Sequence, residues 1–544
     1  MDSKKYFSGK IVDVVNKRIY EGKIEVTGDT IFSITEGKAE NDQYIVPGLI
    51  DAHIHVESSM LIPSEFARLA VIHGTVATVS DPHEIGNVLG IDGVKFMIDN
   101  GKKVPFKFFF GAPSCVPATV FETSGASLDV GDMEELLEMD EIKYMSEMMN
   151  FPGVLFQDKE VMAKLAVAKK NGKPVDGHAP GVLGEDAKKY IEAGISTDHE
   201  CFSMEEALDK ISYGMKVQIR EGSAAKNFET LIPLMKDHSD GIMLCSDDRH
   251  PNDLMAGHMN DIVKRAIKKG YDPIDILRVC TYNPVKHYDL EVGLLQKDDP
   301  ADFIIVDNLD DFNVLKTFVN GNLVAENGKT LIESIQESTP NKFDREEIFP
   351  EEISLKAEGY TIKVQKALEG QLITETLMEK AKISDGFVVS DVERDNLKMV
   401  VINRYQKTDP AIGYVRGFGL KRGALASSIA HDSHNIIAVG ASDEEILRAV
   451  NMVVKTKGGV SLVDGEKELI LPLPVAGIMS NKDGFEIARI YDELDEAAKN
   501  LGSSLNAPYM TLSFMALLVI PELKLSDKGL FNGLKFEFTS LFAE

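Results

Sequence analysis

The segment PGLIDAHIHVESSM, residues 47–60, follows the apolar residues YIV and decides how the middle of the chain is interpreted. His53, His55 and Glu57 occupy every second position, so a strand here directs all three to one face, with neighbours about 6.8 Å apart. Two imidazoles at this spacing can reach one metal ion, because the bonds from zinc to histidine nitrogen are ~2.0–2.1 Å long. The segment therefore predicts a strand that begins in a hydrophobic core and ends at a metal site.

The alternation of an apolar strand with a helical segment continues from residue 47 to residue 294. The strand candidates are IDAHIHVE, TVATVS, FKFFFGA, IKYMSEMM, PVDGHA, ISTDHE, MKVQIRE and GIMLCSDD. Eight such units over roughly 250 residues have the length and rhythm of a (β/α)8 barrel. A doubly wound parallel sheet is the alternative, but it usually has fewer strands, so we expect the α/β fold to be the barrel.

Two further parts are expected outside the barrel. Short strands bounded by turn residues fill residues 1–46 and return at 295–338, so both flanks are predicted to form one composite β domain. Residues 339–352 are polar, contain two prolines and are interpreted as a linker. Residues 353–544 predict a C-terminal α/β domain, with NLKMVVINRY and HNIIAVGA as strands and DEEILRAVNMVVKT as a helix.

The composition restricts the possible partners and the compartment. There are 59 basic and 87 acidic residues, for a formal charge of −28, which argues against nucleic acid and anionic membranes as partners. No apolar run reaches the ~20 residues of a membrane span, and the first residues lack the apolar region of a signal peptide. The four cysteines form no CxxC pair. We therefore expect a cytoplasmic protein with free thiols.

Polar residues cluster where barrel enzymes carry their chemistry, at the carboxyl ends of the strands. They are His53, His55 and Glu57; Asp81, His83 and Glu84; Glu147; His178; Asp198, His199 and Glu200; and Asp247, Asp248 and Arg249. A single HxH is a weak motif, and a lone histidine is more often a hydrogen-bonded loop or core residue. Buried carboxylates without partners cost several kcal/mol, however, and a dication is their natural partner. Four histidines with a central carboxylate and an aspartate match a two-metal site with a bridging hydroxide.

The pattern resembles the amidohydrolase superfamily, which has PGxIDxHxH on the first strand, histidines on strands five and six, and an aspartate on strand eight. Within it, HIHVESSM, TVATVSDPHEIGNVLG, SEMMNFPGV, DGHAPG, REGSAAKN, CSDDRHP and GFGLKRGALASSIAHDSHNIIAVG resemble the bacterial and archaeal adenine deaminase family. These blocks extend over nearly the whole chain.

The resemblance implies hydrolysis of adenine to hypoxanthine and ammonia at a binuclear site, with Mn or Fe as the metals; Zn suits the same ligands. One ion would be held by His53, His55 and Asp247, and the other by His178 and His199. Many members of the superfamily bridge the two ions with a carboxylated lysine on strand four. Lys143 lies earlier on that strand here, and Glu147 occupies its apolar end, so Glu147 is the expected bridging ligand.

The resemblance also implies a mechanism. A metal-bridged hydroxide would attack C6 of adenine, and Asp247 would carry its proton to the departing amine. Protonation of N1 needs an acid within hydrogen-bond reach, for which Glu57, His83 and Glu84 are our candidates, with Glu200 also considered. Asp81, Glu84 and Asp248 could instead orient the ligating histidines.

Several assignments stay open at this point. We expect six residues either to contact the substrate or to support the metal ligands: Asp81, Glu200, Asp248, Arg249, His431 and His434. The polar run around His431 and His434 could cover the barrel mouth, or it could form a contact between domains or subunits. Alternative functions are hydrolysis of another cyclic amide or amidine, and a metal-binding barrel without catalysis. We further expect a homodimer that acts in purine salvage or adenine catabolism.

Overall fold

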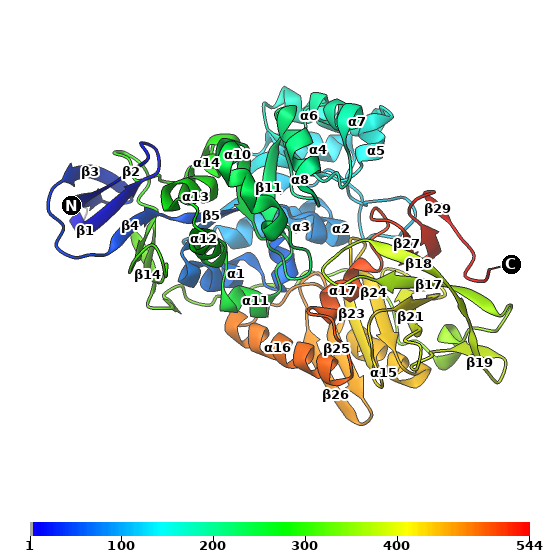
Figure 1. The fold of residues 1–544 in the computed structure, drawn as a ribbon. Coiled ribbons are helices and arrows are strands. Elements are labelled where there is room, and N and C mark those ends of the chain that lie inside the picture. Colours follow the sequence, from blue (N-terminus) through cyan, green and yellow to red (C-terminus); the bar gives the residue numbers. More distant parts are fainter. Residues whose placement is uncertain (1–3, 544) are drawn as a thin grey trace.

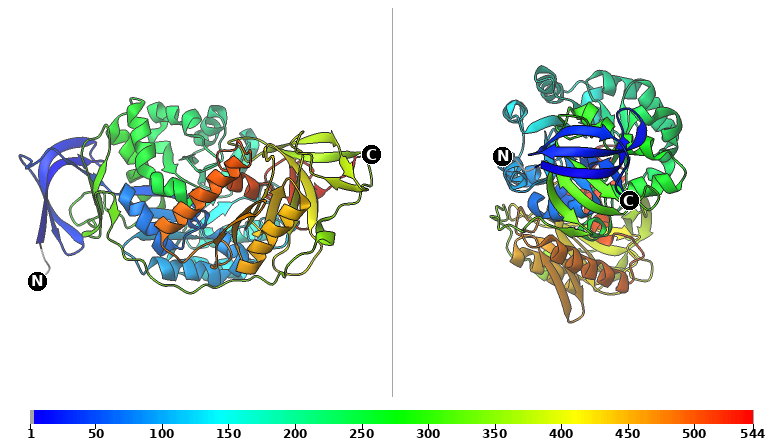
Figure 2. Two further views of the ribbon diagram at one scale, coloured as in Figure 1. Left: turned by 90° about the horizontal axis from the view of Figure 1, so that it is seen from below. Right: turned by 90° about the vertical axis from the view of Figure 1, so that its left-hand side faces the viewer.

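The computed structural model describes residues 4–543 and places the chain in three regions. The N-terminal strands lie at one end of the molecule, the C-terminal elements lie at the other, and a core of parallel strands surrounded by helices lies between them (Figures 1 and 2). Within residues 4–543, no helix is both long enough and apolar enough to cross a membrane.

The core contains a parallel strand in each of the eight predicted segments. β5 (Leu49–Ile54), β6 (Thr75–Ser80), β7 (Lys107–Ala112), β8 (Ile142–Met148) and β9 (Val175–Gly177) form one sheet, and β10 (Thr197–Asp198), β11 (Lys216–Arg220) and β12 (Ile242–Cys245) form another. Backbone hydrogen bonds connect the two sheets at both edges. The amide of Asp247 donates to the His53 carbonyl at 2.9 Å, and the amide of Ser196 donates to the Val175 carbonyl at 2.8 Å.

Helices follow the strands and bury their apolar faces against them. They are α1 (Pro63–Ala70), α2 (His83–Leu89), α3 (Ile91–Gly101), α4 (Val130–Glu138), α5 (Phe151–Leu155), α6 (Lys159–Lys170), α7 (Gly184–Glu192), α8 (Met204–Ser212), α9 (Phe228–Leu231), α10 (Met235–His238), α11 (Pro251–Ala256), α12 (Met259–Lys268), α13 (Pro273–Cys280) and α14 (Tyr282–Tyr288). Local sequence explains many of their starts. Asp158 caps α6, Ser203 caps α8 and Asp272 caps α13 through side-chain oxygens that accept backbone N–H bonds.

A mixed sheet, which contains both antiparallel and parallel strand pairs, combines strands from both flanks of the core. β1 (Lys4–Asp13), β2 (Arg18–Thr27), β3 (Thr30–Glu36) and β4 (Tyr44–Pro47) join β13 (Phe303–Val306), β14 (Val314–Val319), β15 (Asn322–Glu326) and β16 (Lys329–Thr330). β4 connects the two halves because it pairs with both β1 and β13. The stacked rings of Phe303 and Phe318, 4.6 Å apart, lie in the core of this sheet.

The C-terminal region is built on a second eight-stranded sheet. Its strands are β17 (Thr361–Ala367), β18 (Thr374–Lys380), β21 (Leu397–Ile402), β22 (Ala411–Arg416), β23 (Ala424–Ala430), β24 (Asn435–Gly440), β25 (Gly459–Asp464) and β26 (Lys467–Pro472), in the order β18-β17-β22-β21-β24-β23-β25-β26. α15 (Asp443–Thr456), which spans the predicted helix, packs on β23, β24 and β25. The region also contains α16 (Gly484–Asn500), α17 (Pro508–Phe514), a pair of short strands, β19 (Lys382–Ser384) and β20 (Phe387–Val389), and a small sheet of β27 (Leu523–Ser526), β28 (Gly529–Asn532) and β29 (Glu537–Phe538).

The C-terminal region packs directly against the core. α16 contacts α1 and α11, and Arg68 of α1 donates to Asp483 at 2.8 Å. The segment expected to be a linker, residues 339–352, has no helix or strand up to residue 349, and the short 3-10 helix η5 (Pro350–Ile353) begins within it. Phe343 and Ile348 are buried against the C-terminal sheet. This polar segment therefore runs along the surface of the C-terminal domain and is attached to it by two buried apolar side chains.

Candidate active site

The ends of β5 and β12 bring together three of the predicted ligands. His53 Nε2 lies 3.5 Å from Asp247 Oδ1, and His55 Nε2 lies 3.2 Å from the same oxygen. Two donors that each lie about 2.1 Å from a tetrahedral ion are roughly 3.4 Å apart, so this spacing suits a shared ion. The backbone bonds between the ends of β5 and β12 hold His53, His55 and Asp247 at this spacing.

Glu147, near the end of β8, lies between these residues and the other predicted histidines. Its Oε2 is 3.1 Å from His178 Nδ1 and 3.1 Å from His199 Nε2, and it is 3.8 Å from His53 Nε2. The rings of His53 and His199 stack with centroids 4.1 Å apart. Glu147 is thus placed to contact both halves of the cluster, as a bridging carboxylate must.

The hydrogen bonds of the cluster are incomplete without an ion. His53 Nε2, the ring nitrogen that faces Asp247 and Glu147, is buried and has no hydrogen-bond partner among the described residues. A buried polar atom without a partner costs free energy that a metal bond would offset. His55 Nδ1, in contrast, lies 3.3 Å from the Asp81 carbonyl, an interaction that leaves Nε2 free to bind metal. The donor set fits divalent ions.

The two carboxylates of the cluster are held in the ionised form. Burial alone would raise the pKa of Glu147, but His178 and His199 keep it well below its usual range. Burial would also raise the pKa of Asp247, but its neighbours, above all Arg220, hold that pKa well below the usual range. Burial lowers the pKa of His55, yet its bond to Asp247 raises that pKa well above the ordinary value. Surroundings that attract a proton this strongly also attract a dication.

Arg220, the last residue of β11, is a site residue that the sequence reasoning missed. It is fully buried, and its Nη1 donates to Asp247 Oδ2 at 2.7 Å and also to Glu200 Oε1. A second bond joins Nη2 to Glu200 Oε2 at 3.0 Å. Glu200 is therefore the partner of Arg220, and Arg220 orients Asp247. The available signal was the position of Arg220 at the carboxyl end of the predicted strand MKVQIRE.

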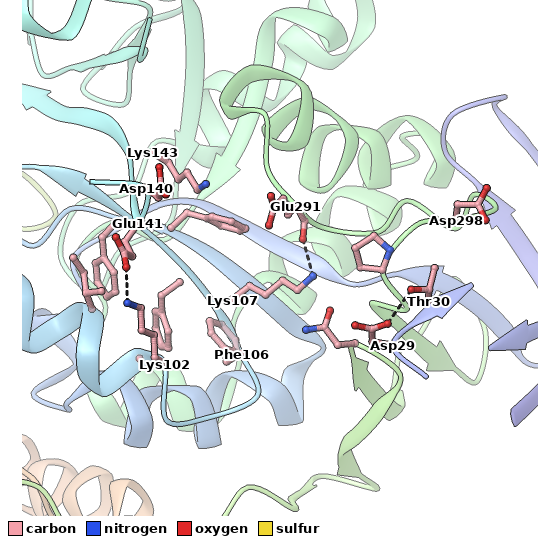
Figure 3. A pocket seen from close by; sticks show the side chains of 17 residues that line it. Asp29, Thr30, Lys102, Phe106, Lys107, Asp140, Glu141, Lys143, Glu291 and Asp298 are labelled. Atoms are coloured by element: carbon pink, nitrogen blue, oxygen red, sulfur yellow. Dashed lines mark hydrogen bonds and ion pairs between the residues drawn. The ribbon is translucent and has the colours of Figure 1, made fainter. Parts of the chain in front are cut away.

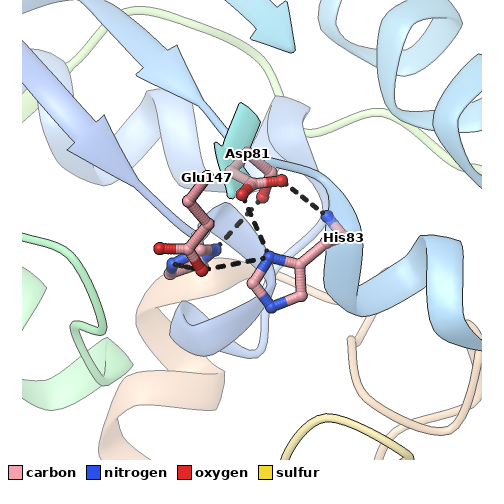
Figure 4. A group of neighbouring side chains, drawn as sticks. Asp81, His83 and Glu147 are labelled. Carbon is pink, nitrogen blue, oxygen red and sulfur yellow. Dashed lines mark hydrogen bonds and ion pairs between the residues drawn. The ribbon is translucent and has the colours of Figure 1, made fainter. Parts of the chain in front are cut away.

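The turn that links β6 to α2 adds a further polar group beside Glu147 (Figure 4). His83 Nδ1 lies 3.1 Å from Asp81 Oδ2 and 3.5 Å from Glu147 Oε1. The carboxylates Asp81 and Glu84, opposing the effect of burial, raise the pKa of His83 well above its usual value. His83 and Glu84 line the small cavity above the cluster, whereas Asp81 supports the His83 ring.

The C-terminal region reaches this turn through a polar run between β23 and β24. His431 Nδ1 lies 2.7 Å from Glu84 Oε1, and His434 Nε2 contacts Glu84 Oε2. Asp432, which was not among the predicted residues, lies 3.7 Å from His83 Nε2. Two interpretations were left open for the run around His431 and His434: a cover over the mouth of the core, or a contact between domains or subunits. In the structure both histidines contact Glu84 of the core within the same chain.

Three other predicted residues have different surroundings. Glu57 accepts a bond from the Ile85 amide at 3.2 Å, and burial raises the pKa of its carboxyl to about 8. Asp248 lines the cavity and accepts a bond from Ser58 Oγ at 2.5 Å. The guanidinium of Arg249 donates to backbone carbonyls, including that of Gly257 at 2.7 Å, and is not brought to the cluster.

A larger cavity, of about 580 Å³, lies at the opposite ends of β7 and β8 (Figure 3). Among its charged lining residues, Lys102 bonds Glu141 at 2.6 Å, and Lys107 bonds Asp302, which lies outside the lining, at 2.6 Å. Lys143 lines this cavity and is therefore remote from the predicted metal ligands. The chemistry lies at the carboxyl ends of the strands, where the cavity is small.

Comparisons with known proteins agree with this geometry. A family model described as "Amidohydrolase family" matches residues 44–324, and one described as "Adenine deaminase C-terminal domain" matches residues 371–537. Three relatives named adenine deaminase cover almost the whole chain. The one from Methanosarcina mazei is 52% identical over 99% of this chain and 100% of its own length. The one from Sulfurovum sp. is 56% identical over 97% and 98%, and the one from Salinibacter ruber is 52% identical over 99% and 99%. The chain belongs to the amidohydrolase family and, within it, to the adenine deaminase family.

Proposed function

We propose that this protein hydrolyses adenine to hypoxanthine and ammonia. The observation that carries the proposal is the coincidence of two features in one chain. Relatives named adenine deaminase are about half identical over its full length, and the predicted ligands converge on one buried cluster at the strand ends. The C-terminal match favours adenine over another cyclic amide or amidine, because the matching model is described as the adenine deaminase C-terminal domain.

Two divalent ions, Mn or Fe in our proposal with Zn as a further possibility, would be held by this cluster. His53, His55 and Asp247 would bind one ion, His178 and His199 the other, and Glu147 both. The ions, when bound, supply a Lewis acid that activates water near neutral pH. Arg220 keeps Asp247 ionised and oriented, so that Asp247 can accept a proton and pass it to the leaving amine. Glu57, His83 and Glu84 stay the candidate donors to N1.

The finer architecture is also part of the proposal. The bonds between β5 and residue 247, and between β9 and residue 196, support a closed (β/α)8 barrel over residues 47–294. The sheet made from both flanks supports a composite β domain over 1–46 and 295–338, with a linker at 339–352 and a C-terminal domain at 353–544. We further propose a cytoplasmic homodimer, without nucleic-acid or membrane partners, that supplies hypoxanthine for purine salvage.

The test is to incubate purified protein, loaded with Mn or Fe, with adenine and to follow the change in ultraviolet absorbance as hypoxanthine forms. Ammonia release is measured in parallel, because equal amounts of both products distinguish hydrolysis from any other loss of adenine. Guanine, cytosine and dihydroorotate serve as control substrates. Failure of the loaded enzyme to turn over adenine would refute the proposal.

A further inference from the structure

The C-terminal region lines one side of the small cavity above the metal-ligand cluster. The volume of this cavity is about 20 Å³, which is room for a single water molecule and far too little for a bicyclic purine. Leu372, Phe514 and Leu517, here called the roof, line it from the C-terminal side, together with His431 and Asp432. If adenine is the substrate, as proposed above, the roof has to shift for adenine to enter and can then close over it.

The roof is assembled from segments that are distant in sequence. Leu372 lies in the loop between β17 and β18, whereas Phe514 ends α17 and Leu517 follows it. All three belong to one apolar cluster, which also contains Ala225 from the loop after β11 of the core. Burial of apolar surface holds these groups together. It does not fix their distance from the metal-ligand cluster, because the hydrophobic effect is non-directional. A directional contact is needed to define their position.

Lys524 of β27 supplies such a contact. Its side chain is fully buried, and its Nζ donates to the Leu372 carbonyl at 2.8 Å and to the Phe514 carbonyl at 2.9 Å. Among the described residues, no carboxylate forms an ion pair with it, and burial alone lowers its pKa to about 7. Burial of an amine without a counter-charge is costly, and the two backbone carbonyls are the partners that offset this cost. Both of its hydrogen bonds go to roof segments.

We propose that Lys524 is a positioning residue of the active site, which fastens the segments carrying Leu372 and Phe514 and thereby sets the height of the roof over the metal ligands. The contacts continue from there to the core. The ring of Phe514 stacks on His431 with centroids 4.7 Å apart and an interplanar angle of 10°. His431 in turn bonds Glu84 at 2.7 Å. A displaced Phe514 therefore alters both the apolar surface available to a purine face and the polar groups beside it.

Lys524→Met tests the proposal, because methionine keeps much of the length and none of the donors. The matched control is Lys398→Met. Lys398, on β21, is also fully buried and donates to a backbone carbonyl, that of Ile353 at 3.0 Å, but it does not contact the roof. Loss of two buried hydrogen bonds should raise KM for adenine about tenfold in Lys524→Met, with a smaller change in kcat and little change of either in the control. An unchanged KM in Lys524→Met, or an equal rise in both variants, would overturn the assignment.

A second readout does not depend on adenine turnover. Hydrogen exchange of the ligand-free variants should be faster in the peptides covering residues 369–374 and 510–518 for Lys524→Met than for Lys398→Met. Equal exchange in those peptides refutes the role of Lys524, whereas inactivity of the wild-type enzyme refutes only the proposed function. If Lys524→Met does not fold, Lys524→Gln replaces it, since glutamine is too short to reach both carbonyls. The same two peptides then decide the outcome.

Discussion

Replacement of Arg220 by methionine is the sharpest test of the site's electrostatics. Arg220 makes two hydrogen bonds to Glu200 and one, of 2.7 Å, to Asp247, and all three side chains are buried. Arg220→Met leaves two buried carboxylates without their cation, which costs about 3–5 kcal/mol of stability. Loss of such an orienting partner typically lowers metal affinity or activity about 10–100-fold. We therefore expect kcat/KM for adenine to fall by about two orders of magnitude.

The assay measures kcat/KM, metal content and thermal unfolding of the same preparations. Arg68→Met is the matched control, because Arg68 also bonds two carboxylates, those of Glu65 and Asp483, but belongs to α1 and faces the start of α16. It should lose stability without a comparable loss of kcat/KM at full metal occupancy. Should folded, metal-loaded Arg220→Met retain kcat/KM within about threefold of wild type, the reasoning that Arg220 orients Asp247 is refuted.

Three further predictions concern the same chain. Asp247→Asn should abolish adenine turnover while elemental analysis still finds much of the metal; surviving activity would exclude the proton-transfer role. Removal of metal by a chelator should lower both the melting temperature and the activity, and addition of Mn should restore both. A melting temperature that does not change when metal is removed would contradict binding within the buried cluster. Lys524 should make the free energy of unfolding rise with pH between about 7 and 10.5 relative to Lys524→Met, because the unfolded chain then binds more protons than the folded one. Denaturant titrations of both proteins at several pH values measure this difference, and its absence would mean that Lys524 is not neutral when buried.

Much of the core and its ligands could be predicted from local sequence. The alternation in IDAHIHVE determines which face His53 and His55 occupy, because the side-chain period of a strand is two. The parallel strands place their carboxyl ends at one edge, so His178, His199 and Asp247 were expected near His53 although they are far apart in the chain. The helix α15 also spans the predicted residues, because its capping serine and amphipathic repeat are local signals.

The surroundings of these ligands could not be predicted in the same way. Nothing near Arg220 in the sequence indicates that its guanidinium pairs with Glu200 and Asp247, because the pairing depends on how β11 lies beside β10 and β12. For the same reason Asp432 was not singled out within the polar run around His431, and that run was left with two interpretations. Its contact with Glu84 joins residues separated by more than 300 positions, and only the packing of the C-terminal region on the core creates it.

The sequence by itself thus determined the βα rhythm, the strand ends that carry imidazoles and carboxylates, and the family resemblance that implies adenine as substrate. These follow from periodicities and short motifs, which act within a few residues. Tertiary structure alone decided that Arg220 pairs with Glu200 and Asp247, and that Lys524 connects the roof segments above the predicted ligands. Such contacts arise when distant segments are buried together, since a buried charge or donor must find whatever partner the packing provides.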